Sequence, residues 1–131
     1  MRALIVDDVM SCRKMLVQIL GQYGETVEAE DGETALALFK KSFHSNPFNL
    51  ICLDIVMPGK DGMIVLKEIR EYEWTMYFHE YKKKRVNIIM LTGEEDMCKL
   101  LSSFSHGVLG YLIKPLEVSD LMEKLYYHKL I

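Results

Sequence analysis

The stretch Leu50-Ile51-Cys52-Leu53-Asp54 is followed directly by Ile55-Val56-Met57-Pro58-Gly59. Four apolar residues run into one carboxylate, and a proline and a glycine then break the chain. A short apolar run bounded by turn residues predicts a strand that is buried on both faces of a sheet. Asp54 then stands at the carboxyl end of this strand, at the edge where open α/β sheets bind ligands. Taken alone, Asp54 could equally be a structural residue that caps the next segment.

The composition indicates one globular domain spanning residues 1–131, with no output domain attached. Half of the residues are hydrophobic, 27% are charged and the net charge is −3, so neither nucleic acid nor a membrane surface is an expected partner. The sequence has neither a signal-peptide layout nor an apolar run that could span a bilayer. Cys12, Cys52 and Cys98 are odd in number and far apart, which favours reduced thiols in a cytoplasmic protein.

Predicted strands and helices alternate along the whole chain. We expect strands at residues 3–6, 26–29, 50–54, 87–92 and 111–113. We expect helices from residue 9 or 11 to 23, at 33–41, from 62, at 97–104 and at 118–125. Gly24 is expected to end the first helix by adopting a positive φ angle. Five such units predict a parallel sheet covered by helices on both faces.

Polar residues follow four of the predicted strands. They are Asp7-Asp8, Asp54, Thr92 and Lys114. Because the carboxyl ends of parallel strands lie along one edge, three carboxylates, a hydroxyl and an ammonium are expected to converge there. Each residue has an ordinary structural explanation, but a chance placement of the whole set at strand ends is much less probable than a functional one.

The residue types indicate phosphoryl transfer. Three neighbouring carboxylates repel one another, and a hard divalent cation such as Mg²⁺ relieves the repulsion. Mg²⁺ typically uses only one or two carboxylates, which leaves another free as a nucleophile. A phosphoryl group in transit also needs a cation and a hydrogen-bond donor, and Lys114 and Thr92 can supply them. The inferred reaction places a phosphoryl group on an aspartate.

The same motifs resemble the receiver domain of two-component response regulators, and the resemblance covers residue 3 to about residue 125. The motifs are Asp7-Asp8, the segment from Asp54 to Gly62, Thr92-Gly93, and Tyr111-Leu-Ile-Lys114-Pro115. The resemblance implies a flavodoxin-like (βα)5 three-layer sandwich with strand order 2-1-3-4-5. It also implies that Asp54 accepts a phosphoryl group from a sensor histidine kinase or a phosphotransfer protein.

The resemblance further implies a role for each site residue. Mg²⁺ (or Mn²⁺) would be held by Asp7, Asp8, Asp54 and the backbone carbonyl of Val56. Thr92 and Lys114 would bind the phosphoryl oxygens, and the Lys114–Pro115 peptide bond is expected to be cis.

A conformational switch is also implied by the resemblance. Thr92 would move toward the phosphoryl group and Tyr111 would turn inward. The change would alter the surface formed by the helix after Thr92, the strand at 111–113 and the helix at 118–125, which would control a downstream protein effector. The alternative for Tyr111 is an ordinary aromatic residue of an amphipathic strand.

The sequence departs from the usual pattern of the family near the site. Gly93 replaces the more common alanine after the threonine. Val56 has no polar side chain to position an attacking water, whereas Glu94 could do so. These two positions tune the lifetime of the aspartyl phosphate in the family, and the sequence does not fix that lifetime.

The segment 72–85 is longer than the usual connection between the third helix and the fourth strand. Aromatic residues precede the basic run Lys82-Lys83-Lys84-Arg85. A solvated end of an extended third helix is the favoured interpretation, ahead of a partner-docking surface. Contact with nucleic acid is the least favoured one, because the basic run is short and the chain is acidic.

We therefore expect a stand-alone, chemotaxis-regulator-like signalling receiver rather than an enzyme, with no membrane or nucleic-acid partner. A phosphorelay carrier or a fragment of a larger regulator are alternatives. An aspartyl-nucleophile phosphatase would need a second acid where Val56 stands. A nucleotide- or flavin-binding module would need a glycine-rich loop in place of Asp7-Asp8-Val9-Met10. A receiver that acts without phosphorylation is less favoured, because every expected site residue is present.

Overall fold

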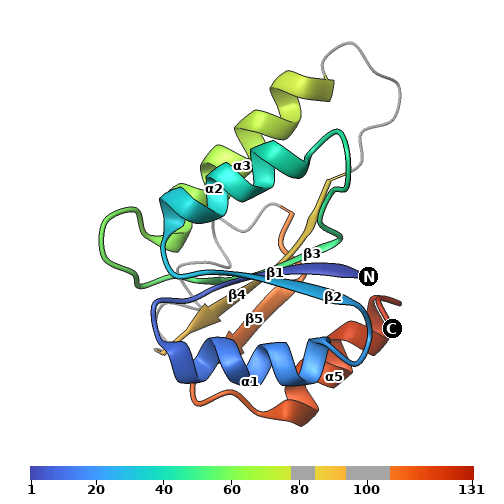
Figure 1. The fold of residues 1–131 in the computed structure, drawn as a ribbon. Helices are drawn as coiled ribbons and strands as arrows, with labels where there is room; N and C mark the ends of the chain where they lie inside the picture. The colour runs from blue at the N-terminus through green and yellow to red at the C-terminus, as the bar shows by residue number, and fades with distance from the viewer. Residues whose placement is uncertain (78–84, 94–106) are drawn as a thin grey trace.

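The chain folds into a five-stranded parallel sheet between two layers of helices, as a computed structural model shows (Figure 1). The structure describes residues 1–77, 85–93 and 107–131. The strands are β1 (Arg2–Val6), β2 (Glu25–Ala29), β3 (Leu50–Asp54), β4 (Asn87–Thr92) and β5 (Gly110–Ile113). The helices are α1 (Met10–Leu20), α2 (Gly32–Ser42), α3 (Gly62–Tyr77) and α5 (Val118–Tyr127). The helix predicted at 97–104 and the residues Glu94 and Lys82 to Lys84 lie outside the described residues.

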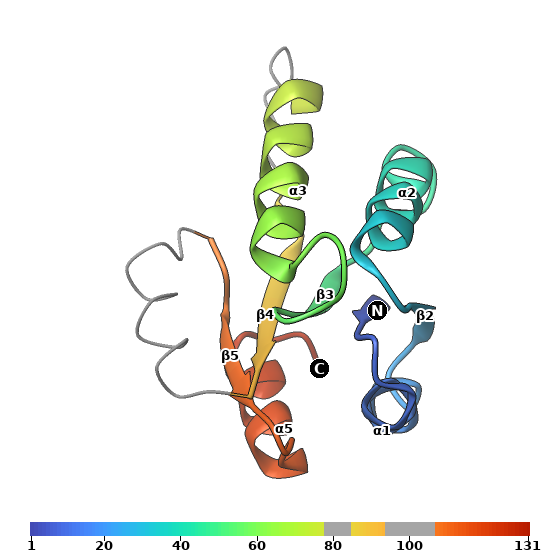
Figure 2. The same ribbon diagram turned by 90° about the vertical axis from the view of Figure 1, so that its left-hand side faces the viewer.

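The strand order is β2-β1-β3-β4-β5, so the predicted fold class is confirmed. Helices α1 and α5 cover one face of the sheet, and α2 and α3 cover the other (Figures 1 and 2). β2 is an edge strand, which suits its alternation of apolar and polar residues, whereas all five residues of β3 are buried. Among the described helices, none is long and apolar enough to cross a membrane.

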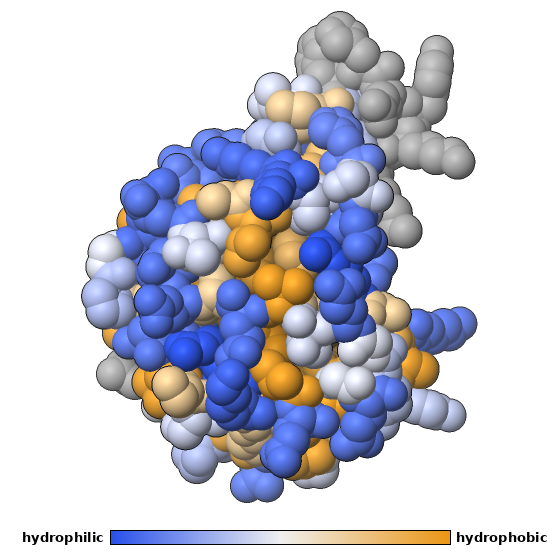
Figure 3. Space-filling view, viewed as in Figure 1, coloured by the Kyte–Doolittle hydropathy of each residue, from blue (hydrophilic) through white to orange (hydrophobic). Residues whose placement is uncertain are grey.

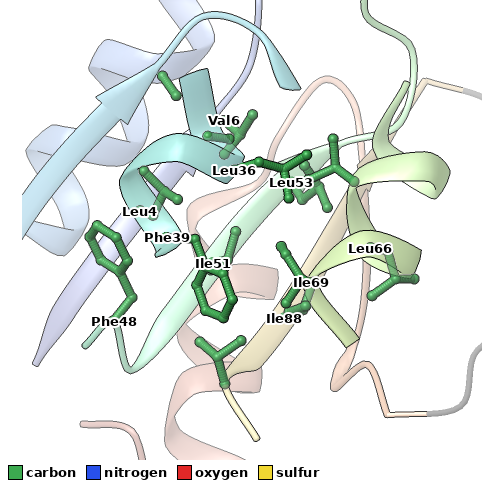
Figure 4. Close-up of a cluster of buried hydrophobic side chains, with 14 of the residues drawn as sticks. Leu4, Val6, Leu36, Phe39, Phe48, Ile51, Leu53, Leu66, Ile69 and Ile88 are labelled. Atoms are coloured by element: carbon green, nitrogen blue, oxygen red, sulfur yellow. The ribbon is translucent and has the colours of Figure 1, made fainter. Parts of the chain in front are cut away.

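Alternation along the central strands divides the core into two clusters. Leu4 of β1 and Ile51 of β3 point toward α2 and α3, where they meet Phe39 and Ile69 (Figure 4). The residues next to Leu4 and Ile51 in the sequence, such as Cys52, belong to the opposite cluster, which packs against α1 and α5. Because a strand sends successive side chains to opposite faces, a continuous apolar run supplies both clusters at once. The outer surface in the same orientation is largely hydrophilic around a central apolar area (Figure 3).

The end of α1 differs from its prediction. The helix stops at Leu20 rather than near Tyr23, and Gly24 does not adopt a positive φ angle. Instead, the backbone of Met1 approaches Gly24 so closely that a side chain there would collide with it. Glu25 N donates a hydrogen bond to Met1 O at 3.0 Å, so the start of the sheet, not a helix cap, requires this glycine.

α3 is longer than the other described helices, as the sequence suggested for the aromatic segment after Ile69. Glu73 of α3 is buried, and its carboxylate accepts a hydrogen bond from Val86 N at 2.7 Å. Arg70 donates to Glu73 at 2.7 Å and to Gly107 O at 2.6 Å. The far end of α3 is thereby joined to the start of β4 and to the turn before β5.

Candidate functional site

Three carboxylates gather at the carboxyl edge of the sheet. Asp7 and Asp8 follow β1, and Asp54 is the last residue of β3, which pairs with β1 through Val6 and Leu53. One oxygen of each acid lies within 4.8 Å of the others. Asp7 and Asp54 are buried and Asp8 is exposed, so the cluster opens to solvent on the side of Asp8. Adjacent parallel strands that end at the same level produce this convergence.

Lys114 reaches the acids from β5, the strand at the opposite edge of the sheet from β2. It follows β5, and its backbone N donates to Thr92 O at 2.7 Å. Its ammonium Nζ lies 2.7 Å from Asp7 Oδ2 and 3.3 Å from Asp54 Oδ2. Burial lowers the pKa of Lys114, but the two carboxylates outweigh burial and raise the pKa above its usual value. Lys114 is therefore a fixed positive charge between two acids, and its bond to Pro115 is cis as the resemblance implied.

Asp54 is held in an environment that disfavours its charge. Burial raises the pKa of Asp54, and the nearby Asp7 and Asp8 raise it further, while Lys114 lowers it. The net result is a pKa of about 6. An added positive charge next to Asp54 would therefore stabilise its ionised form.

The cluster suits a hard cation. Its donor set consists of carboxylate oxygens, which Mg²⁺ and Mn²⁺ both accept. Asp7 Oδ2 is buried, and its contact among the described residues is the ion pair with the Lys114 ammonium at 2.7 Å. A buried carboxylate oxygen next to two further acids can also serve a metal ion.

The remaining predicted site residues lie around the cluster. Thr92 is the last residue of β4 and is buried. The residue before it, Leu91, pairs with Asp54 across β3 and β4. Tyr111 is half-buried on β5 and packs against the core beneath α2 and α3. The side chain of Val56 is 68% exposed beside the site. The fourth predicted residue, Glu94, is not among the described residues.

Sequence reasoning missed one buried charge next to the acids. Arg13 of α1 is buried and donates a hydrogen bond from Nη1 to Asp7 O at 2.8 Å. A signal was present, because Arg13 shares the inward stripe of α1 with Leu16 and Leu20 at helical spacing. A long cationic side chain on an apolar stripe indicates a buried polar partner.

A cavity of about 380 Å³ lies away from this site. Phe48, Glu73 and Tyr77 are among its lining residues, and none of the three acids or Lys114 is. The polar cluster at the strand ends therefore stands as the candidate site on its chemistry, not on the size of a pocket.

Comparison with known proteins agrees with this geometry. The family described as "Response regulator receiver domain" matches residues 3–126. Chemotaxis protein CheY-3 of Vibrio cholerae is 35% identical over 127 residues, covering 95% of this chain and 88% of that protein. Chemotaxis protein CheY of Pseudomonas aeruginosa is 32% identical, covering 95% and 93%.

Two further similarities concern folds and longer proteins. The solved structure of Vibrio cholerae CheY4 at low pH superposes with a TM-score of 0.76 at 30% identity, covering 96% of both chains. Transcriptional regulatory protein ResD of Bacillus subtilis is 35% identical over 115 residues, but the match covers only 42% of that protein. With its sheet order, its acid cluster and a family match over nearly its whole length, this chain belongs to the response regulator receiver domain family, the phosphorylation-dependent receivers of two-component signalling.

Proposed function

We propose that Asp54 is the residue that accepts the phosphoryl group. The observation that carries this proposal is the meeting of Asp7, Asp8 and Asp54 within 4.8 Å, with Lys114 bridging two of them. Asp54 Oδ2 already contacts the ammonium at 3.3 Å, so a group added to this carboxylate would be next to a positive charge. Asp7 is less suitable as acceptor, because it is fully buried and its Oδ1 accepts a hydrogen bond from Val9 N at 2.9 Å.

In the proposed reaction, a carboxylate oxygen of Asp54 attacks the phosphorus of the donor. The new O–P bond forms as the bond to the leaving group breaks, and the leaving group keeps that electron pair. Lys114 stabilises negative charge on the phosphoryl oxygens, and Thr92 donates a hydrogen bond to one of them. Asp7, Asp8, Asp54 and the Val56 carbonyl would hold Mg²⁺ (or Mn²⁺), which when bound supplies further charge neutralisation. The chain would promote only its own phosphorylation and dephosphorylation.

The proposed donor is a sensor histidine kinase or a phosphotransfer protein, and the proposed target is a protein effector. Support for an effector surface comes from β5 and α5, where Ile113, Val118 and two consecutive tyrosines, Tyr126 and Tyr127, are exposed. Exposed aromatic residues are enriched at protein interfaces. Thr92 and Tyr111 would connect the site to this surface, since β4 and β5 pair directly. A cytoplasmic location is part of the proposal, and the free thiols of Cys12 and Cys52 suit it.

Phosphorylation of the purified protein by a small phosphodonor tests this function. With Mg²⁺ present, the intact mass should rise by one phosphoryl group, and Asp54→Asn should abolish the increase. Asp61→Asn is the matched control, because Asp61 lies in the same loop but caps α3 by accepting a hydrogen bond from Ile64 N at 3.0 Å. An unlabelled wild-type protein, or equal labelling of Asp54→Asn, would refute the assignment.

A further inference from the structure

The guanidinium of Arg13 connects three elements next to the acid cluster. Nη1 donates to Asp7 O at 2.8 Å, and Nε donates to Glu28 Oε1 at 3.3 Å. Arg13 belongs to α1, Glu28 to β2, and Asp7 opens the loop between β1 and α1. A single buried side chain therefore ties the loop that carries two of the acids to a helix and to an edge strand.

A charged side chain at the position of Arg13 is electrostatically unfavourable unless its contacts with Glu28 and Asp7 O compensate. It is the fourth residue of α1, and the amino-terminal turn of a helix disfavours cations. Its side chain is also withdrawn from water, which a charged group tolerates only when it is paired and hydrogen-bonded. Glu28 supplies the opposite charge, and the Asp7 carbonyl supplies a buried acceptor.

The loop that Arg13 holds is short and carries two like charges. Asp7 N donates to Ala29 O at 3.1 Å, so β2 fixes the entry to the loop. Arg13 fixes the carbonyl of the same residue, and Asp7 Oδ1 accepts from Val9 N. Repulsion among three carboxylates would otherwise favour a loop conformation that moves Asp7 and Asp8 away from Asp54.

We propose that Arg13 is a positioning residue for the metal site, holding the loop so that Asp7 and Asp8 stay convergent with Asp54. The inference rests on the proposed function, since it concerns the same acid cluster. Arg13 touches no carboxylate of the cluster in this arrangement; it acts through the Asp7 backbone. Groups that orient metal ligands in this way typically change metal affinity by about 10- to 100-fold when they are removed.

Lys14 provides a matched control. Its ammonium contacts Glu28 Oε2 at 2.9 Å, so it shares the acidic partner of Arg13. Lys14 is exposed, and its ammonium donates a hydrogen bond to Glu28 rather than to the Asp7 loop. Lys14→Met and Arg13→Met thus remove the same charge from adjacent residues, but only the second removes the hydrogen bond to Asp7 O.

The test is Mg²⁺ binding measured by isothermal titration calorimetry on the wild type, Arg13→Met and Lys14→Met. We expect the Mg²⁺ dissociation constant to rise about tenfold in Arg13→Met and to stay within about twofold of wild type in Lys14→Met. In phosphodonor assays, Arg13→Met should need more Mg²⁺ for half-maximal labelling but should reach the wild-type rate at saturation. A folding defect alone would lower the rate at every Mg²⁺ concentration.

If Arg13→Met does not fold, Arg13→Ala decides the question, because it also removes the hydrogen bond to Asp7 O. Wild-type affinity in the folded Arg13 variant, or an equal loss in Lys14→Met, would overturn the inference while leaving the proposed function intact. A wild-type protein that binds no Mg²⁺ and takes no phosphoryl group would overturn both.

Discussion

Gly62, the first residue of α3, packs directly against the backbone of Asp54. Its N donates a hydrogen bond to Ile55 O at 2.7 Å, and a Cβ atom at this position would collide with Asp54 O and approach Ile55 Cα to 2.8 Å. The amino end of α3 is thus seated on the residue proposed to be phosphorylated. Only a residue without a side chain allows this approach.

Gly62→Ala is therefore expected to lower the free energy of unfolding by about 1–3 kcal/mol, because the backbone must shift to accept the methyl group. Gly93→Ala is the control, since a Cβ atom there meets no atom of the described residues within 4 Å. That variant should change the free energy of unfolding by less than about 0.5 kcal/mol. Urea denaturation measures both, and equal stabilities of the two variants would contradict the close packing at Gly62.

Asp54→Asn is expected to stabilise the metal-free protein at pH 7. The folded pKa of Asp54, about 6, lies above the ordinary value of 3.8. The folded state therefore holds this proton to higher pH than the unfolded state. The contribution of Asp54 to the free energy of unfolding is thus greatest below pH 4 and falls as pH rises through 6. Removing the charge should recover up to about 3 kcal/mol at pH 7, from roughly two pKa units.

Chemical denaturation in the presence of EDTA at pH 7 and at pH 4 checks this prediction. Asp54→Asn should have a higher free energy of unfolding than the wild type at pH 7, and this difference should be largely absent at pH 4. Glu30→Gln is the control, because Glu30 is an exposed acid at the end of β2 outside the cluster. A destabilised Asp54→Asn at pH 7, or a gain of the same size at both pH values, would contradict the cause assigned to the raised pKa.

Adding Mg²⁺ is expected to offset most of this difference in stability. A cation that binds only the folded state raises the free energy of unfolding by about 2.7 kcal/mol at one hundred times its dissociation constant. The wild type and Glu30→Gln should show this increase in thermal unfolding, and Asp54→Asn should show much less of it. An equal response of all three proteins would place the metal away from Asp54.

Glu73 should be among the more costly residues of α3 to remove. Its buried carboxylate accepts a hydrogen bond from Val86 N and pairs with Arg70 at 2.7 Å. Glu73→Ala leaves a partly buried guanidinium and a buried N–H without this partner, at a cost of about 3–5 kcal/mol. Glu71→Ala, whose side chain is 64% exposed and lies 4.0 Å from Lys67, is the control and should change little. Similar urea midpoints for the two variants would show that the network contributes no stability.

The sequence was sufficient for the sheet and for the edge at which the polar residues gather. The apolar run of β3 and the alternation of β2 are local patterns, and each reports directly how many faces of a strand are buried. Asp7, Asp54, Thr92 and Lys114 could be placed at strand ends for the same reason. The end of α1 could not be predicted from local sequence. Gly24 is a glycine because the backbone of Met1 approaches it, and Met1 lies outside the sequence pattern of α1.

The sequence by itself thus determined the order of strands and helices, the buried faces and the set of groups at the carboxyl edge, since all of these follow from spacing along the chain. Only the tertiary structure decided which of those groups touch: Lys114 between Asp7 and Asp54, and Arg13 on the Asp7 carbonyl. These contacts join residues from different strands and helices. Their distances depend on how the strands pair and how α1 packs on the sheet, and spacing along a single element carries no information about either.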